Sequence, residues 1–537
     1  MARKKKTLKE IKAKLTRQRR AAKTLRICAF AALAALIIFP YLIVYKPPLP
    51  TGTHIRTSLI PIDADNTKLL IDSTARDDST GERTMHQEIF DEILTLIEEA
   101  DSAILLDFFL WNSWQGMQRE EHRSLSSELA DALIDKKEND PEIAIIVMTD
   151  PLNRLYGSEE GAVFSRMAKA GIPVVFTDLD LLRDPNTLYA GPARVYGKPI
   201  SREPWFQKHL KKKSFTHPFF HGGPHVSALQ LGNLFFFKAN HRKLIVADSA
   251  FDGWRMVVSS LNPSDSSSAH SNMGVRLDGD IAWRVAREEL LAIEWSGGAS
   301  GHVLEAGPDD WGKVLRSIRN ALPSPRPVEA PEGGQAMAEW ITEGAIRERV
   351  IELLNGTTRG DHVRIAMFYI SDRAVIQAVK DAAVGGARVQ LILDMNRDAF
   401  GRDKDGIPNR PVAGELMSFA AEENVFIDVK WADTHGEQFH TKAMSITNPD
   451  AAKHQFTCGS ANWTRRNIGD FNMEANIYLQ NVPEITKRFN TYFDNAWRNE
   501  GKILRTLPYE DAALTGSRLS LKKVIYRLRE STGMCSF

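Results

Sequence analysis

Helical and strand-like segments alternate along the chain, and their order occurs twice. A segment with apolar residues at helical spacing begins at residue 85 and leads into a continuous apolar run at 103, and a segment from 346 and a run from 363 repeat this pair. Each half then continues with another helical segment and two more short apolar runs, at 143 and 171 in the first half and at 389 and 424 in the second. Short β-branched and aliphatic runs that alternate with helices are typical of parallel strands covered on both faces. We therefore predict an α/β fold of two repeats, each a mixed, mostly parallel sheet flanked by helices.

The two repeats are predicted to span residues 85–300 and 340–505. Between them, residues 322–335 contain four prolines and two glycines, a composition typical of an extended linker. A chain of 537 residues is also too long for one ordinary hydrophobic core. Length and pattern thus agree on a duplicated body.

The N-terminal region has a different pattern. Residues 1–26 contain twelve Lys or Arg and one Glu, and residues 27–45 contain no charge. About 20 apolar residues span the hydrocarbon core of a bilayer, and no small-residue cleavage site follows, as a cleaved signal peptide would require. We predict a basic cytoplasmic tail and a single transmembrane signal anchor, with the body on the outer, periplasmic side of the cell membrane.

Composition narrows the class of protein. The chain is 43% hydrophobic and 26% charged, with a net charge of +1, which describes a folded globular body that is not strongly basic. Its three cysteines lie far apart and form no C-x-x-C pair. This spacing predicts neither a disulfide framework nor a structural zinc site.

The candidate chemistry lies in strand-like segments at the same point of each repeat. The first carries His241, Lys243 and Asp248 in the spacing H-x-K-x4-D, and the second carries His440 and Lys442 in the spacing H-x-K. In a strand, residues i and i+2 share one face, so each His and Lys are expected to project together. A single match of this kind has a high false-positive risk, but two at equivalent points are hard to attribute to chance. Polar residues follow both motifs, namely Asn262 after the first and Ser460 and Asn462 after the second.

This duplicated pattern resembles the phospholipase D superfamily, in which H-x-K-x4-D is followed by G-S-x-N. The resemblance covers residues 85–500, and residues 394–411 resemble bacterial membrane-anchored members of the cardiolipin synthase and phospholipase D type. It implies a phosphodiesterase or phosphatidyltransferase with its active site between the repeats. Members of that family act on phospholipids or cut nucleic acid, and the predicted anchor favours a phospholipid as the substrate.

Such chemistry needs these residue types. Attack on a phosphodiester builds negative charge on phosphorus oxygens, which Lys243 and Lys442 would stabilise, and Asn262, Asn462 and Ser460 are candidate donors to the same oxygens. One imidazole attacks phosphorus to form a phosphohistidine, and the other protonates the leaving alkoxide and then deprotonates the incoming alcohol or water. No metal or cofactor is expected, since a lysine beside each histidine repels a cation.

The chain departs from the family pattern at two positions. Thr447 stands where the second motif would have its Asp, and Glu474, where related enzymes have a carboxylate that orients a histidine, is matched in the first half by Gly274. The family's usual order makes His241 the nucleophile and His440 the acid. Glu474 in the same half favours His440 instead, because a carboxylate on Nδ1 supports an imidazolium. We favour His241, and both assignments stay open.

Two basic segments bear on membrane contact. Residues 515–537 include an apolar stripe of Leu521, Val524, Ile525 and Leu528 beside basic residues, which predicts either a helix on an anionic membrane surface or one packed on the body. Residues 205–223 mix aromatic residues with four lysines, which suits lipid phosphates, single-stranded nucleic acid or a plain exposed loop.

Two other functions remain as alternatives to lipid turnover. A nuclease of the same superfamily is one, although a near-neutral chain lacks the broad basic face usual for nucleic-acid enzymes. A catalytically inactive, membrane-tethered lipid-binding scaffold is the other, favoured by the departures at Thr447 and Gly274. Both histidines and both lysines are present, which favours an enzyme.

Overall fold

The computed structural model describes residues 46–114, 123–218, 223–249, 253–299, 301–305, 310–324, 334–399 and 402–534, with residues 13, 14, 16, 23, 24, 28, 30–35 and 38–40 before them. Most of the predicted tail and anchor, and residues 325–333 of the predicted linker, lie outside these ranges. No helix within the described ranges is long and apolar enough to cross a membrane. The anchor at 27–45 therefore stays a prediction.

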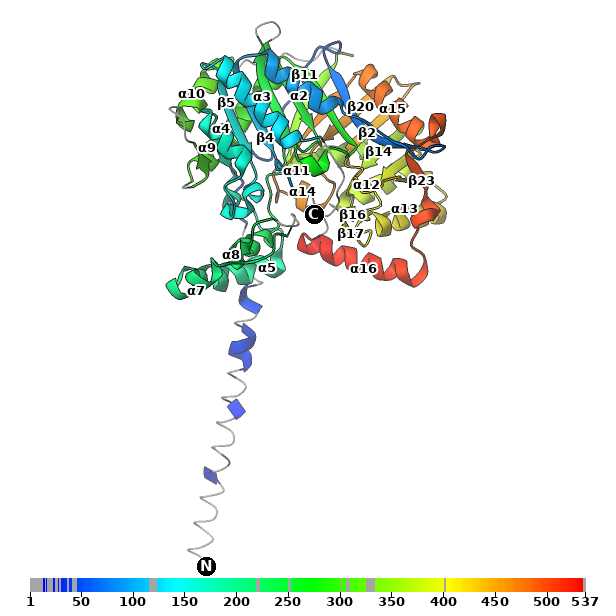
Figure 1. Cartoon of the computed structure of the whole chain (residues 1–537). Helices are drawn as coiled ribbons and strands as arrows, with labels where there is room; N and C mark the ends of the chain where they lie inside the picture. The colour runs from blue at the N-terminus through cyan, green and yellow to red at the C-terminus, as the bar shows by residue number, and fades with distance from the viewer. Residues whose placement is uncertain are drawn as a thin grey trace, which may run out of the picture.

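The two repeats have the same succession of elements and lie side by side (Figure 1). The first repeat consists of β2 (Lys68–Asp77), β3 (Arg83–His86), α2 (Glu88–Glu99), β4 (Ala100–Phe108), α3 (Leu125–Asn139), β5 (Ala144–Thr149), α4 (Ala162–Lys169), β6 (Val174–Phe176), β9 (Lys243–Ser249), β10 (Gly253–Ser259), β11 (Asn272–Asp278), α9 (Asp280–Gly297) and α10 (Trp311–Ala321). The second consists of β13 (Met337–Thr342), α11 (Glu343–Asn355), β14 (His362–Met367), α12 (Arg373–Val384), β15 (Arg388–Leu393), α13 (Asn409–Glu423), β18 (Ile427–Ala432), β19 (Lys442–Asn448), β20 (Lys453–Gly459), α14 (Arg465–Ile468), β21 (Ala475–Gln480) and α15 (Pro483–Arg498). The first repeat thus begins with β2, before residue 85.

The sheets also have the same strand order. The first contains the path β6-β5-β4-β9-β10-β11-β2 and the second the path β18-β15-β14-β19-β20-β21-β13. The α/β class is confirmed, but the prediction of mostly parallel sheets is wrong. Among the strands of the described residues, only β4, β5 and β6, and likewise β14, β15 and β18, pair in parallel. Those strands are joined by crossover helices, whereas β9, β10 and β11 follow each other through short connections that allow antiparallel pairing.

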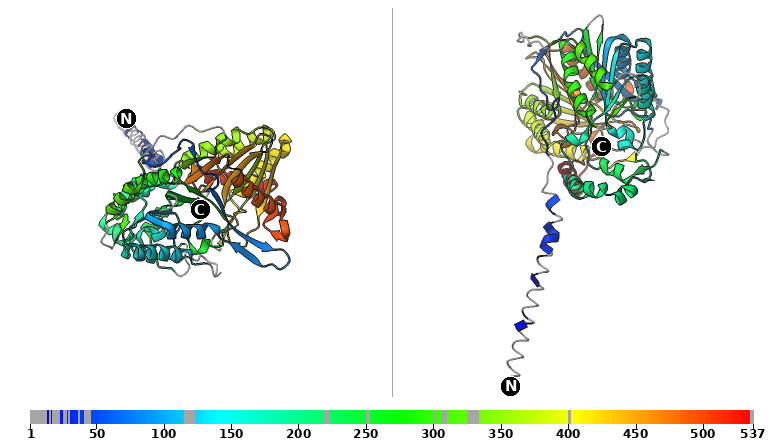
Figure 2. Two further views of the ribbon diagram at one scale, coloured as in Figure 1. Left: turned by 90° about the horizontal axis from the view of Figure 1, so that it is seen from above. Right: turned by 90° about the vertical axis from the view of Figure 1, so that its left-hand side faces the viewer.

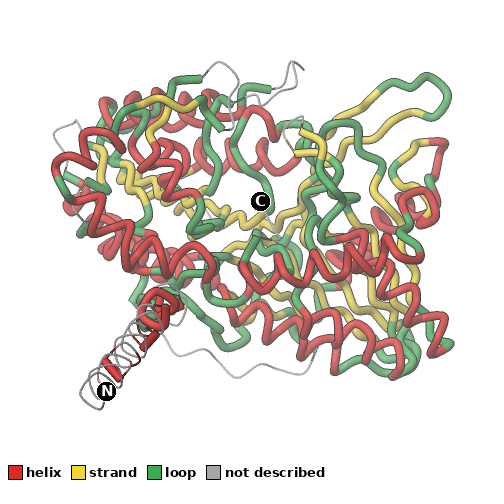
Figure 3. Tube along the Cα trace, turned by 90° about the horizontal axis from the view of Figure 1, so that it is seen from below, coloured by secondary structure: helices red, strands yellow, loops and turns green. Residues whose placement is uncertain are grey.

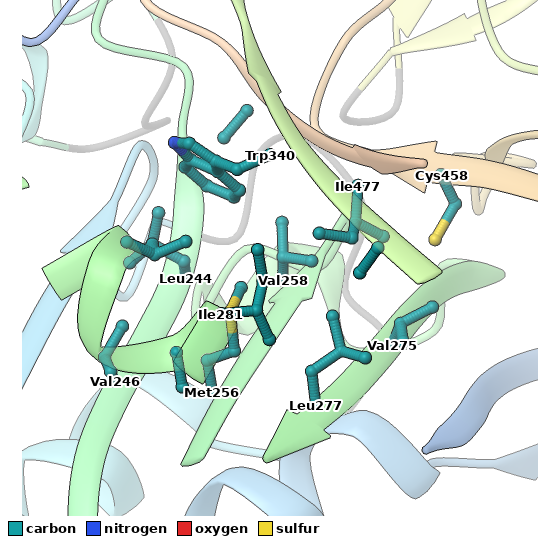
Figure 4. Close-up of a cluster of buried hydrophobic side chains, with 14 of the residues drawn as sticks. Leu244, Val246, Met256, Val258, Val275, Leu277, Ile281, Trp340, Cys458 and Ile477 are labelled. Carbon is teal, nitrogen blue, oxygen red and sulfur yellow. The ribbon is translucent and has the colours of Figure 1, made fainter. Parts of the chain in front are cut away.

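The repeats share one hydrophobic core between their antiparallel strands (Figure 4). Side chains from β9, β10, β11 and α9 meet Trp340 of β13, Cys458 of β20 and Ile477 of β21, all of them buried. Trp340 is fully buried, and burial of one large side chain contributes roughly 1.5–3 kcal/mol. The shared core fixes the two repeats as one body and brings the starts of β9 and β19 together.

Backbone pairs cross directly from one repeat to the other next to those starts. Asn240 forms an isolated parallel bridge with Met473, and Ser271 forms one with Phe439. The amide of His241 donates to the carbonyl of Met473 at 2.8 Å. The strand-like segment that carries His241 consequently forms strand β9 only from Lys243 onward, since residues 239–241 pair with the second repeat.

Two segments extend the repeats at one end of the molecule (Figures 1 and 2). The first repeat has an insertion between β6 and β9 with α5 (Thr187–Pro192), α6 (Lys198–Arg202), α7 (Pro204–Leu210), β7 (Lys213–Phe215), β8 (Val226–Ser227) and α8 (Ala228–Leu234). The second repeat has a short connection there, and the chain ends with α16 (Gly516–Thr532), which packs on α13. Figure 3 views the molecule from this end, with helices and loops in front of the strands.

Candidate active site

His241 and His440 line one cavity between the repeats. Each lies two positions before the first residue of its motif strand, which is Lys243 in β9 and Lys442 in β19. The cavity holds about 980 Å³ of empty space, including the part open to solvent. The two motifs lie almost 200 positions apart in the sequence. The structure brings them together because β9 and β19 both begin at this cavity.

The two lysines lie behind the histidines. Lys243 is 0% and Lys442 1% exposed, and the ammonium of each donates to the carbonyl of the histidine two residues earlier at 2.8 Å. The charge of Lys243 lowers the pKa of Lys442, after the larger effect of burial. When both lysines are protonated, their positive charges repel each other next to the cavity, and an anionic group there would relieve the repulsion.

Phe109 and Phe368 make the arrangement nearly two-fold symmetric. The ring of Phe109 lies 4.7 Å from that of His241, and the ring of Phe368 lies 4.9 Å from that of His440. Lys243 Nζ is 5.1 Å from the Phe109 ring centroid, and Lys442 Nζ is 5.2 Å from that of Phe368. Sequence reasoning missed both rings, although each directly follows an equivalent strand, β4 or β14.

Glu474 supports the histidine of the other repeat. Its carboxylate oxygens lie 2.9 and 3.0 Å from His241 Nδ1, and it also accepts from Ser460 Oγ and Asn467 Nδ2. The pairing of Glu474 with His440 considered from the sequence is wrong. The backbone bridge between Asn240 and Met473 carries Glu474 across to His241 instead.

Asn272 holds the corresponding place next to His440. Its Oδ1 lies 3.1 Å from His440 Nδ1. The match of Glu474 with Gly274 is wrong by two residues. Ser259 pairs with Gly274, and the equivalent Gly459 pairs with Asn476. Gly274 therefore corresponds to Asn476, and Asn272 corresponds to Glu474. A Cβ at Gly274 would lie 2.7 Å from Ser259 Cβ, so this glycine permits close strand packing and does not mark a lost carboxylate.

The residues predicted to bind phosphate divide into two groups. Asn262 and Asn462 line the cavity, where they remain candidates for contact with a phosphate. Ser460 is fully buried, donates to Glu474 and accepts from the amide of Ala475 at 2.9 Å. Ser460 therefore positions the carboxylate and does not reach the substrate.

Asp248 lies outside the site. Its carboxylate accepts from the amides of Ser102 at 2.9 Å and Ala103 at 2.8 Å, and from Ser102 Oγ. It stands five positions beyond Lys243 along the strand, a distance of about 16 Å. Its interpretation as a catalytic residue is wrong: it ties the end of β9 to the start of β4. Thr447, in the same place on β19, accepts weakly from Asn490, so the second motif has lost no cavity group.

A buried ionic cluster, which sequence reasoning missed, supports the His241 side. Arg242 is 0% exposed and donates to Glu289 at 2.6 Å and to Glu343 at 2.7 Å. Glu343 Oε1 in turn accepts from the amide of Glu474 at 3.0 Å. The sequence offered one signal of this cluster, since Arg242 stands between His241 and Lys243 in a segment whose apolar pattern predicts burial. Through Glu343 this cluster fixes the backbone that carries Glu474.

Burial dominates the protonation of the site. It lowers the pKa of His241 and of His440 well below the usual value, and the charges of Lys243 and Lys442 lower both further. Burial also lowers the pKa of Lys243 to about 7 and raises that of Glu474 to about 8. Each shift disfavours the charged form of a buried group, and the negative charge of an entering phosphodiester would favour the protonated form of each of them. Among the described residues, no group of three or more His, Cys, Asp or Glu could hold a metal ion.

Fold and site define a class of protein, a duplicated α/β body with one histidine from each repeat at a shared cavity. Residues 350–497 match the family described as "Cardiolipin synthase, PLD-like domain". This match lies within the second repeat, which is therefore similar to the PLD-like domain of that family. No curated protein sequence matches it.

Similar solved structures include a phosphatidylserine synthase of Haemophilus influenzae Rd KW20, with a TM-score of 0.52 and 12% identity over 89% of this chain and 97% of that one. A polyphosphate kinase of Porphyromonas gingivalis has a TM-score of 0.42 and 13% identity over 87% of this chain and 53% of that one. A phospholipase D family member from Salmonella typhimurium has a TM-score of 0.24 and 16% identity, covering 31% of this chain and 97% of that one. At 12% identity, the similarity to the phosphatidylserine synthase shows a common fold and nothing more.

Proposed function

We propose that this protein is a phospholipid phosphodiesterase or phosphatidyltransferase that works through a covalent phosphohistidine. The observation that carries the proposal is the pair of histidines in one cavity, each with an acceptor on Nδ1, a carboxylate for His241 and an amide oxygen for His440. An acceptor on Nδ1 leaves Nε2 of each ring for chemistry at phosphorus.

The unequal acceptors assign the roles. A phosphohistidine carries positive charge on its ring, and the carboxylate of Glu474 stabilises such charge better than the neutral amide of Asn272 does. His241 is therefore the nucleophile, and His440 is the general acid and base. Without a carboxylate, His440 gives up its proton more readily.

The reaction then runs in two balanced steps. Neutral His241 attacks phosphorus through Nε2, the bond from phosphorus to the leaving oxygen breaks, and protonated His440 gives its Nε2 proton to that oxygen. In the second step, neutral His440 takes a proton from water or an alcohol, whose oxygen attacks phosphorus and releases His241. The buried lysines stabilise the charge on the phosphoryl oxygens in both transition states.

A phospholipid is the proposed substrate. The matched family is described as cardiolipin synthase, and apolar side chains line much of the cavity, among them Phe109, Leu110, Trp114 and Leu152. The predicted anchor would hold the body at a cell membrane with the N-terminus in the cytoplasm. The positions of Gly274 and Thr447 away from any catalytic contact favour an enzyme over an inactive scaffold.

The test is lipid turnover by the purified full chain in detergent. Phosphatidylglycerol and phosphatidylethanolamine would be offered with and without glycerol, alongside His241→Ala and His440→Ala. We expect cardiolipin or phosphatidic acid, lost in both variants. Lipids left intact by the folded wild-type chain would contradict the proposal, and cleavage of single-stranded DNA in their place would indicate a nuclease.

A further inference from the structure

Exposed apolar side chains are concentrated at the end of the molecule formed by the insertion and α16. Among the described residues from 46 onward, fifteen large hydrophobic side chains are exposed, and twelve of them lie in residues 181–235 or 521–534. The most exposed include Trp205 at 64% and Val524 at 67%. We call the surface of residues 181–218, 223–235 and 516–534 the basal face. An apolar surface of this kind on a folded body indicates a binding partner.

The packing of α16 fixes which of its sides faces outward. Tyr526 and Glu530 are buried, and the Glu530 carboxylate accepts from the amide of Arg465 and from Ser371 Oγ, each at 2.6 Å. Leu521, Val524 and Leu528 therefore point to solvent at helical spacing. The sequence left two alternatives for this segment, a helix on a membrane surface and a helix packed on the body. The helix packs on the body and still keeps an apolar stripe exposed.

The insertion and α16 form one continuous surface. A Cβ on Gly533, next to the end of α16, would lie 2.9 Å from Pro185 Cβ, and Arg465 donates to the carbonyl of Pro185 at 3.3 Å. Arg183 donates to the carbonyl of Pro47 at 3.3 Å. The chain that follows the predicted anchor thus joins the body at the same end (Figures 1 and 2).

The charge of the basal face indicates what binds there. Lys208, Lys211 and Lys212 are exposed on and just after α7, and none of the three forms an ion pair with a carboxylate within the described residues. Arg518 and Arg527 are exposed on α16. Apolar side chains with a basic border suit an anionic bilayer, whereas two copies of this face would bring like charges together.

The basal face also adjoins the cavity. The 3-10 helix Pro151–Gly157, which contributes Leu152 and Tyr156 to the cavity lining, packs against α8. Helix α14, which contributes Arg466 to the lining, packs against α16. Both walls of the cavity are therefore attached to the elements that carry the basal face.

We propose that the basal face lies on an anionic lipid bilayer, with the α16 stripe and the aromatic residues of α7 inserted at the level of the headgroups. This contact would orient the body so that a lipid reaches the cavity without crossing bulk water. The passage of lipid to the cavity rests on the proposed function, and the docking itself does not.

The test places a fluorophore on the full chain in vesicles. In a His241→Ala background with Cys28→Ser and Cys535→Ser, a single NBD label is attached at Val524→Cys, Trp205→Cys or Val384→Cys. Val384 is 59% exposed and ends α12 before the start of β15, on the sheet edge opposite the cavity. It is a matched control with the same membrane tether.

In vesicles of phosphatidylglycerol and phosphatidylcholine, we expect a blue shift and a several-fold rise in emission at positions 524 and 205, with quenching by nitroxide lipids. Position 384 should show neither. Lys208→Glu, Lys211→Glu and Lys212→Glu combined should reduce the shift at 205. Equal behaviour at all three positions would overturn the docking. An NBD blue shift that depended on the density of protein in the vesicles, and not on their content of anionic lipid, would indicate that the basal face binds a second copy of the chain. That result would also overturn the docking. Because no readout uses turnover, failure of the docking and failure of the proposed reaction are distinguishable.

Discussion

His241 Nδ1 lies 3.0 Å from a carboxylate oxygen of Glu474, which stands 233 positions further along the chain and in the other repeat. The carboxylate that supports His241 is therefore supplied by the second repeat. His440 has the amide oxygen of Asn272 in the equivalent place. The two histidines are thus placed alike and supported unequally, and this difference leads to the predictions that follow.

Removing the charge of Glu474 should slow turnover while preserving the fold. Glu474→Gln keeps an acceptor for His241 but cannot balance a charged ring, and we expect kcat to fall by about 10²–10⁴-fold. Asn272→Asp is the matched variant, because its new carboxylate should raise the pKa of His440 and move the pH optimum upward. The measurement is kcat against pH for both, with circular dichroism as a control. Equal kcat in Glu474→Gln and wild type would contradict the assigned role.

A substrate whose leaving group needs no proton should separate the histidines. With a phosphatidyl ester of p-nitrophenol, His440→Ala should still release p-nitrophenol in one burst and retain the phosphatidyl group covalently, since the second step lacks its base. His241→Ala should release none. Mass spectrometry of the acid-quenched protein would locate the adduct. The opposite pattern would make His440 the nucleophile.

Lys243 should reduce stability while serving catalysis. Its pKa of about 7 in the folded protein lies below the ordinary lysine value of 10.5, so between these pH values the unfolded chain binds more protons. The burial of Lys243 therefore costs stability, which is recovered as the pH rises. Lys243→Met should therefore raise the free energy of unfolding near pH 7 by roughly 1–4 kcal/mol and abolish turnover. Urea unfolding at pH 7 measures the first effect, and a less stable variant would contradict it.

Anion binding should be coupled to proton uptake. Burial and neighbouring charges lower the pKa values of His241, His440 and Lys243, and a bound anion raises them again. Titration calorimetry with inorganic phosphate near pH 7, in buffers of different ionisation enthalpy, should show net proton uptake. In the His241→Ala, His440→Ala double variant the uptake should be smaller. Proton release on binding would contradict this account of the site.

Asp248 should matter for folding and little for turnover. Asp248→Ala leaves the amides of Ser102 and Ala103 without their acceptor, and we expect a loss of about 1–3 kcal/mol in the free energy of unfolding. Because Asp248 does not reach the cavity, kcat of the folded protein should stay close to wild type. Thr447→Asp, which restores the family motif, should likewise leave kcat unchanged. A large loss of kcat in a stably folded Asp248→Ala variant would contradict this prediction and would indicate a catalytic role for Asp248.

The sequence by itself determined the duplication, the order of helices and strands, and the positions of both histidines and both lysines. These features are local: a strand or helix shows its periodicity within a few residues, and a repeated H-x-K motif is visible wherever the chain folds. The same pattern did not separate parallel from antiparallel strands, since buried strands of either kind are apolar.

Only the tertiary structure decided which residues serve each histidine. The pairing of Glu474 with His241, the place of Asn272 beside His440 and the two-residue offset of Gly274 follow from strand register and from bridges between the repeats. Such contacts join residues far apart in sequence, and they form because the antiparallel halves of the two sheets bury one core together. Local pattern carries no information on that packing, because it is a property of both repeats at once.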